Sequence, residues 1–351
     1  MAILAKKINI IGTNLVLFLA IILVFANLAR ARNFTYREEN NKDYKDNKSN
    51  TEFFTFAKNL ASEAKNQGVS QKTTDDFLYH LKFIDRAIKL DQTQPDKTHK
   101  FSDYLKNVLP ESRIKKAKNL YQENKILLNK IGKEYGVNPN FIVALWGIES
   151  DFGNNMGHFN VINSLATLAY EGRRADFFKS ELIEALKIVD QGNINIEEMQ
   201  GSWAGAMGQI QFMPSSFAKY AVDYDGDSKK DIWHNKSDAF ASIANYLANY
   251  GWDDKSSCGY KVRIPANYDK SLIDRNVEKT LLFWQESGIS FATAGGKHNV
   301  TNAKFSLVQP DSSNNLNVGY LVSTNYKVIL QWNRSLYFAT AVCMLSDRIY
   351  K

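Results

Sequence analysis

Apolar positions recur every three or four residues through most of the chain, which is the spacing of amphipathic helices. One such stretch has helical spacing at Phe77, Leu81, Ile84 and Ile88. A polar loop at 91–100 contains Pro95. The middle of the chain is therefore predicted to be almost entirely helical. The predicted helical segments are 51–109, interrupted by that loop, 111–135, 161–169, 175–189, 238–250 and, near the end of the sequence, 326–349.

Glycine, asparagine and proline mark several helix ends. Gly136 is placed to end one helix, and Asn138 and Pro139 are suited to the cap and first turn of the next. Gly192 and Gly251 stand just beyond two further predicted helices. After residue 251 the pattern changes, because 260–265 and 304–308 have the alternation of short strands around a predicted helix at 277–287. A small β-containing insert is expected there.

The first residues have the pattern of an export signal. Lys6 and Lys7 precede an apolar run at 15–26, and Ala29-Arg30-Ala31 offers a small-residue cleavage site. Counted from Ile8 the segment reaches about 20 residues, so an uncleaved membrane anchor is the alternative. Residues 33–51 are polar and charged, which is typical of a disordered tether.

Composition excludes several classes of protein. The chain has 351 residues, 44% of them hydrophobic, and a net charge of +7, so it can bury a full core and could bind an anionic polymer. Its lysines are scattered and form no basic helix, which argues against nucleic acid. Its five histidines lack the ligand spacing of a zinc enzyme. Cys258 and Cys343 could pair in an oxidising compartment or remain buried as small apolar residues, and no disulfide is predicted.

A single acid interrupts an otherwise apolar segment. Glu149 is the only charged residue in 137–150, and helical geometry places it on the stripe that holds Ile142 and Trp146. Burial would hold a proton on this carboxyl group, which is the state that a general acid needs. The alternative is a glutamate at a helix end that turns into water beside Asp151. A second segment, 201–216, is rich in glycine and alanine, and either lines a binding site or packs tightly against another helix.

Together these two segments resemble the paired motifs of the lytic murein transglycosylase B family. The motifs are W-G-I-E-S-D-F-G at 146–153 and G-S-W-A-G-A-M-G-Q-I-Q-F-M-P-S-S at 201–216. Three further stretches agree with that family in order and spacing: G-R-R-A-D-F-F at 172–178, D-Y-D-G-D-S-K-K-D-I-W at 223–233 and N-Y-K-V-I-L-Q-W-N-R-S-L-Y-F-A at 325–339. The likeness covers about 101–349.

The resemblance implies a mainly α, α+β protein with a lysozyme-like catalytic core. It implies cleavage of peptidoglycan glycan strands between N-acetylmuramic acid and N-acetylglucosamine, with the muramoyl residue's own hydroxymethyl oxygen as nucleophile and 1,6-anhydro ends as product. One carboxyl group then suffices, whereas ordinary glycosidases use two. Asp151 lies about 200° from Glu149 around the helix and is interpreted as a loop or capping residue.

Residue roles also follow from the resemblance. Glu149 would be acid and then base, and no cofactor is expected for catalysis. Substrate contacts are expected from Ser202, Gln211, Arg173, Arg174, Tyr104, Tyr246, Asn333, Tyr337, Met207 and Phe212. The domain boundaries expected are 1–31 for a signal or anchor, 32–51 for the tether, 52–110 for a helical N-terminal part, 111–254 for the catalytic core, 255–318 for the β-containing insert and 319–351 for the return to the core.

An acidic loop at 223–231 has the spacing of a calcium-binding loop at several positions. The candidate ligands are Asp223, Asp225, Asp227, the carbonyl group of Lys229, Asp231 and Asp238. Ser228 and His234 replace the usual glycine and glutamate of such loops. The loop is therefore interpreted either as a structural Ca²⁺ site or as an acidic turn that caps the next helix.

The sequence predicts an exported, monomeric, periplasmic peptidoglycan lytic transglycosylase of a Gram-negative envelope, held at the inner membrane if 1–31 is uncleaved. Cell-wall synthesis or division complexes are candidate partners. Two rival functions remain: a lysozyme-type hydrolase that uses water in the same cleft, and a catalytically silent peptidoglycan-binding scaffold.

Overall fold

The computed structural model describes residues 47–93, 100–292, 303–310 and 317–350. These residues divide into two compact units. We call residues 47–93 and 145–246 the Glu149 unit, and residues 100–144 and 247–350 the sheet unit. Helices α8 (Pro139–Ser150) and α12 (Lys236–Asn249) each contribute to both units. The predicted signal or anchor at 1–31 and most of the predicted tether lie outside the described residues.

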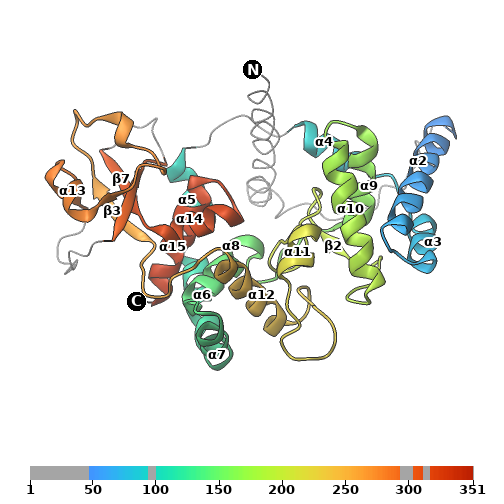
Figure 1. The fold of residues 1–351 in the computed structure, drawn as a ribbon, viewed down its shortest axis with the longest axis horizontal. Coiled ribbons are helices and arrows are strands. Elements are labelled where there is room, and N and C mark those ends of the chain that lie inside the picture. Colours follow the sequence, from blue (N-terminus) through green and yellow to red (C-terminus); the bar gives the residue numbers. More distant parts are fainter. Residues whose placement is uncertain (1–46, 94–99, 293–302, 311–316, 351) are drawn as a thin grey trace, which may run out of the picture. The chain divides into compact units, whose positions relative to one another are not determined.

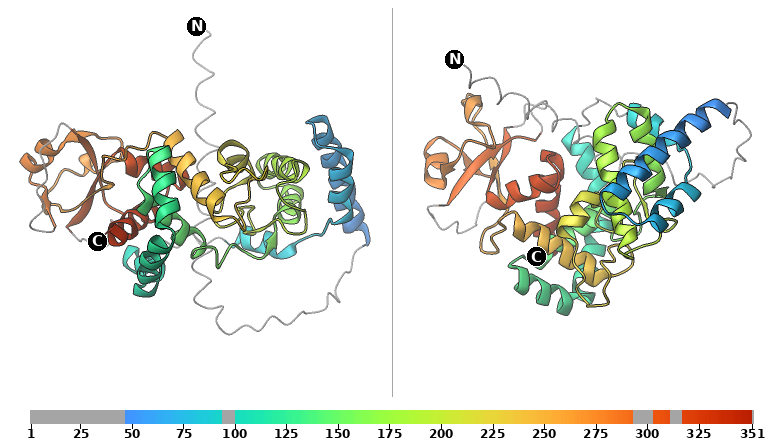
Figure 2. Two further views of the ribbon diagram at one scale, coloured as in Figure 1. Left: turned by 90° about the horizontal axis from the view of Figure 1, so that it is seen from below. Right: turned by 45° about the vertical axis from the view of Figure 1, so that its right-hand side comes forward.

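The Glu149 unit is built around helix α9 (Val161–Glu171; Figure 1), in which nine residues are buried. A helix that is buried all round lies within the core of its unit, and its buried polar side chains need hydrogen-bond partners. Helix α10 packs along it, and α2 and α3 pack against α10 (Figure 2). The other elements of this unit are α2 (Asn47–Asn66), α3 (Gln71–Tyr79), α4 (Asp85–Gln92), β1 (Phe159–Asn160), α10 (Ala175–Asp190), β2 (Gln200–Gly201), α11 (Pro214–Tyr220) and the first part of α12.

Two predictions for the N-terminal helices were wrong. Helix α2 begins at Asn47, so residues 47–51 of the expected tether are helical, and the buried Phe53 and Ala57 fix this helix to the unit. The apolar spacing from Phe77 to Ile88 does not mark one helix, because α3 ends at Tyr79 and α4 begins at Asp85. Side chains of α9 hold the intervening backbone in place, with Lys82 N–H donating to Asn163 and Ile84 N–H to Thr167.

The sheet unit combines a helical layer with the predicted β-containing insert. Its antiparallel five-stranded sheet has the order β4-β6-β7-β3-β5. Trp284 of α13 lies on one face of the sheet and packs into a core with Val262 and Leu321. The elements are α5 (Phe101–Val108), α6 (Glu111–Glu123), α7 (Lys125–Tyr135), the first part of α8, the end of α12, β3 (Gly259–Arg263), the 3₁₀ helix η2 (Lys270–Leu272), β4 (Lys279–Thr280), α13 (Leu281–Glu286), β5 (Ser290–Phe291), β6 (Lys304–Val308), β7 (Val318–Val322), α14 (Thr324–Trp332) and α15 (Leu336–Tyr350).

Three predicted helical segments of the sheet unit are interrupted or shorter. The segment 111–135 breaks at Asn124, whose side-chain amide donates to the carbonyl group of Leu120 and competes with the helical pattern. The segment 326–349 is divided into α14 and α15 at Asn333. Helix α13 begins only after Thr280, because 279–280 pair with β6 and the Thr280 hydroxyl accepts from Phe283 N–H.

The helix ends marked by glycine are confirmed. Gly136 and Gly251 have φ values of 65° and 84°, and Gly192 has 78°. Asn138 is used differently from the prediction, since its side chain accepts from the Trp252 indole N–H and donates to the carbonyl group of Asp254. Cys258 and Cys343 form a disulfide, with their Cα atoms 5.9 Å apart. Within the described residues no helix combines the length and apolar character needed to cross a membrane.

Candidate active site

Glu149 lies in the last turn of α8 and is 2% exposed. The residues around it on this helix are buried too, including Trp146, Ile148 and Ser150. The predicted burial of the acid is thus confirmed, and the alternative of a solvent-exposed helix end is wrong. Asp151 lies beyond the helix in a left-handed turn, with φ 51°, and accepts a hydrogen bond from Asn154.

Gln209 fastens the end of α8 to the glycine-alanine segment. Its side-chain oxygen accepts from the Trp146 indole N–H at 3.0 Å, and its side-chain nitrogen donates to the carbonyl group of Trp233 at 3.0 Å. The Ser150 hydroxyl donates to the backbone carbonyl of Gln209 and accepts from Gly153 N–H. These bonds lie on both sides of Glu149 along the helix, so they fix its backbone. The sequence analysis missed this residue, although its place inside the 201–216 motif was a signal.

The glycine-alanine segment folds tightly on the chain itself. Strand β2 pairs with β1, and Met207 forms bridges to Gly201 and Phe212. A Cβ atom on Gly201 would lie 2.1 Å from the carbonyl oxygen of Ala206, and one on Gly157 would lie 2.0 Å from the carbonyl oxygen of Gly201. Here the glycines are needed because backbone meets backbone. Close contact of backbone with backbone, and not the packing of one helix on another, therefore requires glycine at 201 and at 157.

Ser202 and Gln211 are built into the same turns. The Ser202 hydroxyl accepts from Ala206 N–H at 3.0 Å. The Gln211 side-chain nitrogen donates to the carbonyl groups of Met156 and Gly208, both at 2.9 Å. Gln211 also has a φ of 51°, in the left-handed region that few non-glycine residues adopt. Such strain is common at functional sites, where the surrounding contacts hold it in place.

Three of the predicted substrate-binding side chains form the core beside this segment. Met207 has no exposed surface, and Phe212 and Tyr246 are 3% and 6% exposed. The rings of Phe212 and Tyr246 are 5.7 Å apart, and Tyr246 also meets Tyr220 edge to face. Their burial indicates a supporting role for Met207 and Phe212 in particular.

Arg173 and Arg174 converge on Asp91, which is 1% exposed and was not predicted. Arg173 donates through Nε to the Asp91 carboxylate at 2.8 Å and through Nη2 to its backbone carbonyl at 2.9 Å. Arg174 forms an ion pair with the other carboxylate oxygen. The pair of guanidinium groups leaves this cluster with one net positive charge. The buried Nε–H of Arg174 has no acceptor among the described residues.

The remaining predicted residues belong to the sheet unit. Tyr104 and Tyr337 are 5.5 Å apart, measured between ring centroids, and both contact Phe101. Asn333 is 1% exposed and its side-chain oxygen accepts from Ser335 N–H, while its Nδ2 has no hydrogen-bond partner within the described chain. A buried amide with an unused donor is costly in a folded protein unless a ligand accepts from it.

The acidic loop brings three of its predicted ligands together. Carboxylate oxygens of Asp223, Asp225 and Asp227 lie within 4.8 Å of one another. Asp238, by contrast, is fully buried and accepts from Tyr224 N–H and Asp231 N–H, so it braces the loop. Asp231 caps the following turn by accepting from two backbone N–H groups. Burial is the main reason that the pKa of Asp238 is raised, while its two backbone hydrogen bonds lower it.

Residues 52–347 match the family described as the Transglycosylase SLT domain. The chain belongs to the lytic murein transglycosylase B family. It is 28% identical over 294 residues to the membrane-bound lytic murein transglycosylase B of Escherichia coli (strain K12), which covers 80% of this chain and 79% of the relative. The fold and enzyme class predicted from the sequence are confirmed: the protein is a mainly helical, lysozyme-like lytic transglycosylase that acts on peptidoglycan.

Solved structures of the family share this fold. SltB3 from Pseudomonas aeruginosa, crystallised with NAG-anhNAM-pentapeptide, is 36% identical, with a TM-score of 0.81 over 85% of this chain and 79% of that one. Escherichia coli Slt35, crystallised in complex with calcium, has a TM-score of 0.71 over 84% of this chain and 92% of that one. At 24% identity the second likeness concerns the fold alone.

Proposed function

We propose that this protein cleaves peptidoglycan strands with Glu149 as its only acid and base, and that it leaves 1,6-anhydromuramoyl ends. The observation that carries the proposal is the deep burial of Glu149 at the end of α8, within the motif predicted to hold the catalytic acid. The other acids that are buried among the described residues lie outside that motif and have structural roles. Asp91 pairs with two arginines, Glu181 accepts from Ser215, and Asp238 accepts from the acidic loop.

The chemistry needs one carboxyl group because the substrate supplies the nucleophile. Glu149 donates its proton to the glycosidic oxygen as the bond from that oxygen to the anomeric carbon breaks. The resulting carboxylate accepts the proton of the muramoyl hydroxymethyl group, whose oxygen forms the new bond to the same carbon. Protons and bonds balance, and Glu149 ends protonated again. Asp151 lies in a left-handed turn beyond the helix, which supports its interpretation as a loop residue.

Each unit, taken by itself, holds one buried donor that suits a carboxylate or carbonyl oxygen of the substrate. The Nε–H of Arg174 and the Nδ2 group of Asn333 are buried donors without acceptors in the described chain. Carboxylate and carbonyl oxygens of a muropeptide would satisfy them. Tyr104 and Tyr337 offer ring faces of the kind that pack on sugars. We include Ser202 and Gln211 as residues that shape the site through their turns.

The deciding experiment is product analysis of digested sacculi by mass spectrometry, with wild type and Glu149→Gln side by side. We expect anhydro ends from the wild type and a rate about 10²–10⁴ lower in the variant, because the amide cannot transfer the proton. Reducing muramic ends would instead identify a hydrolase. Undiminished release by the variant would remove Glu149 from the mechanism.

We also propose a structural Ca²⁺ at the acidic loop, with Asp223, Asp225 and Asp227 as its carboxylate ligands. Three hard oxygen donors in one loop suit this ion, and water would complete its coordination. The carboxylates already accept loop N–H groups, for example Ser228 N–H to Asp223 at 2.9 Å, so the loop is shaped in advance. Terbium luminescence competed with Ca²⁺ should report the site, and Asp225→Asn should weaken it. If the wild type and the variant gave the same terbium luminescence, the loop would not be the Ca²⁺ site and would be interpreted as a helix-capping turn.

For location, we propose export to the periplasm and attachment to the inner membrane if residues 1–31 remain uncleaved. The paired cysteines support an oxidising compartment, and the Escherichia coli relative is named as membrane-bound. Fractionation of cells with an antibody against the chain tests this directly. Recovery in the cytosol, with both thiols reduced, would contradict it.

A further inference from the structure

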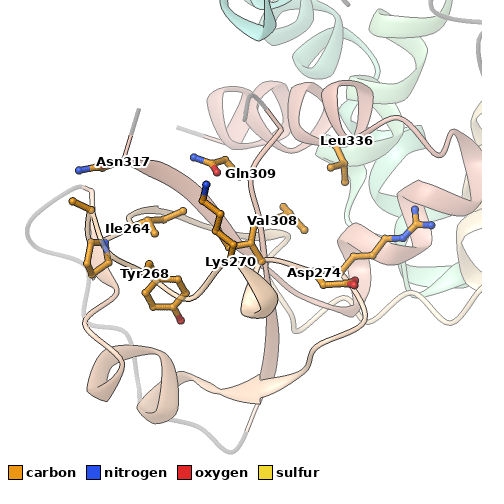
Figure 3. A pocket seen from close by; sticks show the side chains of 12 residues that line it. Ile264, Tyr268, Lys270, Asp274, Val308, Gln309, Asn317 and Leu336 are labelled. Atoms are coloured by element: carbon orange, nitrogen blue, oxygen red, sulfur yellow. The ribbon is translucent and has the colours of Figure 1, made fainter. Parts of the chain in front are cut away.

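A pocket opens in the sheet unit, at one end of the five-stranded sheet. Its volume is about 780 Å³, and it lies where strands β3 and β6 end and β7 begins (Figure 3). Ile264 and Val308 form apolar walls. Lys270 and Asp274 come from the segment that connects β3 to β4, and Figure 3 shows Lys270 reaching across the opening toward Gln309.

Hydrogen bonds hold the rim of this pocket in shape. The buried Ser306 hydroxyl of β6 donates to the backbone carbonyl of Arg275 at 2.9 Å. The Tyr268 hydroxyl is 3.0 Å from the Ser287 hydroxyl, which fixes the ring along one wall. Asp274 accepts from Asn276 N–H at 2.8 Å, forming a local turn. The rim therefore presents its charged side chains from a braced backbone.

Charges of both signs line this rim. Lys270, Asp274 and Arg275 are exposed, and in the described part of the chain none of them forms an ion pair. Among the described residues, their side chains therefore remain available to a charged ligand. A ligand with a carboxylate and an ammonium group would meet complementary partners here, while its apolar parts contact Ile264 and Val308.

We propose that this pocket binds the peptide stem of peptidoglycan, a short peptide that carries several carboxylates and an amino group. The proposal rests on the proposed function, because the enzyme meets such stems on every strand that it cleaves. Charge pattern favours peptide over sugar. A sugar site is usually made of flat aromatic faces and neutral polar groups, whereas this pocket has one aromatic ring, two cations and one carboxylate. Lys270 and Arg275 would bind the stem carboxylates and Asp274 the amino group.

The test uses the full-length protein and a synthetic stem tetrapeptide without sugar, N-acetyl-L-Ala-γ-D-Glu-meso-diaminopimelate-D-Ala, in isothermal titration calorimetry. The acetyl group replaces the link to muramic acid, so diaminopimelate carries the only ammonium group. The test variant is Lys270→Gln with Arg275→Gln. The matched control is Arg263→Gln with Lys304→Gln, which removes the same charge from exposed residues of the same sheet that do not line the pocket. We expect at least tenfold weaker binding in the test variant and an unchanged dissociation constant in the control.

Asp274→Asn should weaken the same tetrapeptide but not an analogue in which alanine replaces the diamino acid. Equal binding by wild type, test variant and control, or no binding of the tetrapeptide at millimolar concentration, would overturn the proposal. The proposal would also be overturned if peptide-free glycan oligomers bound to the wild type and the control but not to the test variant. Because calorimetry needs no turnover, failure of glycan cleavage would overturn the proposed function and leave this result interpretable.

Turnover provides an independent check. On glycan strands stripped of peptide by an amidase, the test variant should cleave at the wild-type rate. On peptide-bearing sacculi the test variant should release products several-fold more slowly at low substrate concentration. The cause should be a higher KM than that of the wild type. Equal slowing on both substrates would overturn the proposal, because it would place the two cations in the general binding of glycan.

Discussion

Asp91 carries its negative charge almost completely inside the protein, where Arg173 and Arg174 compensate for it. Asp91→Asn should therefore lower the free energy of unfolding by about 2–3 kcal/mol, less than for a fully buried triad because Arg173 is 41% exposed and can return to water. Urea unfolding measures the change. The exposed pair Asp85–Lys89 provides the control, since Asp85→Asn should change stability by less than about 0.5 kcal/mol. Similar effects of both substitutions would contradict a structural role for the Asp91 cluster.

Glu181 makes stability depend on pH. Burial is the main reason that its pKa is raised above the ordinary 4.5, and the two hydrogen bonds from Ser215 oppose this rise. A raised folded-state pKa means that the folded protein binds the proton more tightly, so this contribution is complete below about pH 4.5 and is lost as the pH rises through the folded pKa.

Glu181→Gln removes that dependence and keeps a side chain that can bond to Ser215. As the pH rises from 4 to 8, the wild type should lose the stability contributed by Glu181, and the variant should not. The unfolding free energy of the variant minus that of the wild type should therefore increase. Urea titrations at several pH values measure the difference, and the exposed Glu123→Gln serves as control. A difference that stays constant over this range would show that Glu181 ionises normally.

At the scale of elements, Gln209 connects α8 with the turns of the glycine-alanine segment. Gln209→Ala would leave the buried indole N–H of Trp146 and the carbonyl group of Trp233 without their partner. Each loss costs about 1–3 kcal/mol, so we expect destabilisation of about 2–6 kcal/mol. Urea unfolding of the variant and the wild type measures the difference in unfolding free energy. The control is Gln200→Ala, because Gln200 of β2 is exposed. A change below 1 kcal/mol would show that water replaces the glutamine.

The sequence predicted the positions of helices and strands better than it predicted the contacts between them. Gly136 and Gly251 marked helix ends correctly, because a left-handed cap depends on local chemistry. The spacing from Phe77 to Ile88 failed because Asn163, over eighty residues away in sequence, supplies the hydrogen bond that holds the loop at Lys82. Within the site, the motif at 146–153 made Glu149 the candidate acid, and the predicted burial of its side chain is confirmed. Asp91 and Gln209 escaped notice because their importance lies in partners that only the fold brings to them.

For the whole molecule, the link between Cys258 and Cys343 joins the start of the β-containing insert to the last helix, across 85 residues of sequence. Both cysteines belong to the sheet unit, so the link limits the unfolded conformations of that unit above all. In the chain-entropy view, a closure of this length stabilises a protein by roughly 4–5 kcal/mol. The sequence alone did not predict the pairing, because two cysteines far apart in sequence reveal nothing of their separation in space.

The double substitution Cys258→Ala with Cys343→Ala should lower the midpoint of urea unfolding, and dithiothreitol should lower that of the wild type to a similar extent. The reductant should leave the double variant unchanged, which separates loss of the disulfide from other effects of the reagent. Thiol titration of the exported, unreduced protein should find no reactive cysteine, even after denaturation. Two titratable thiols in that sample would mean that the cysteines remain reduced in the cell, and the oxidising location would lose its structural support.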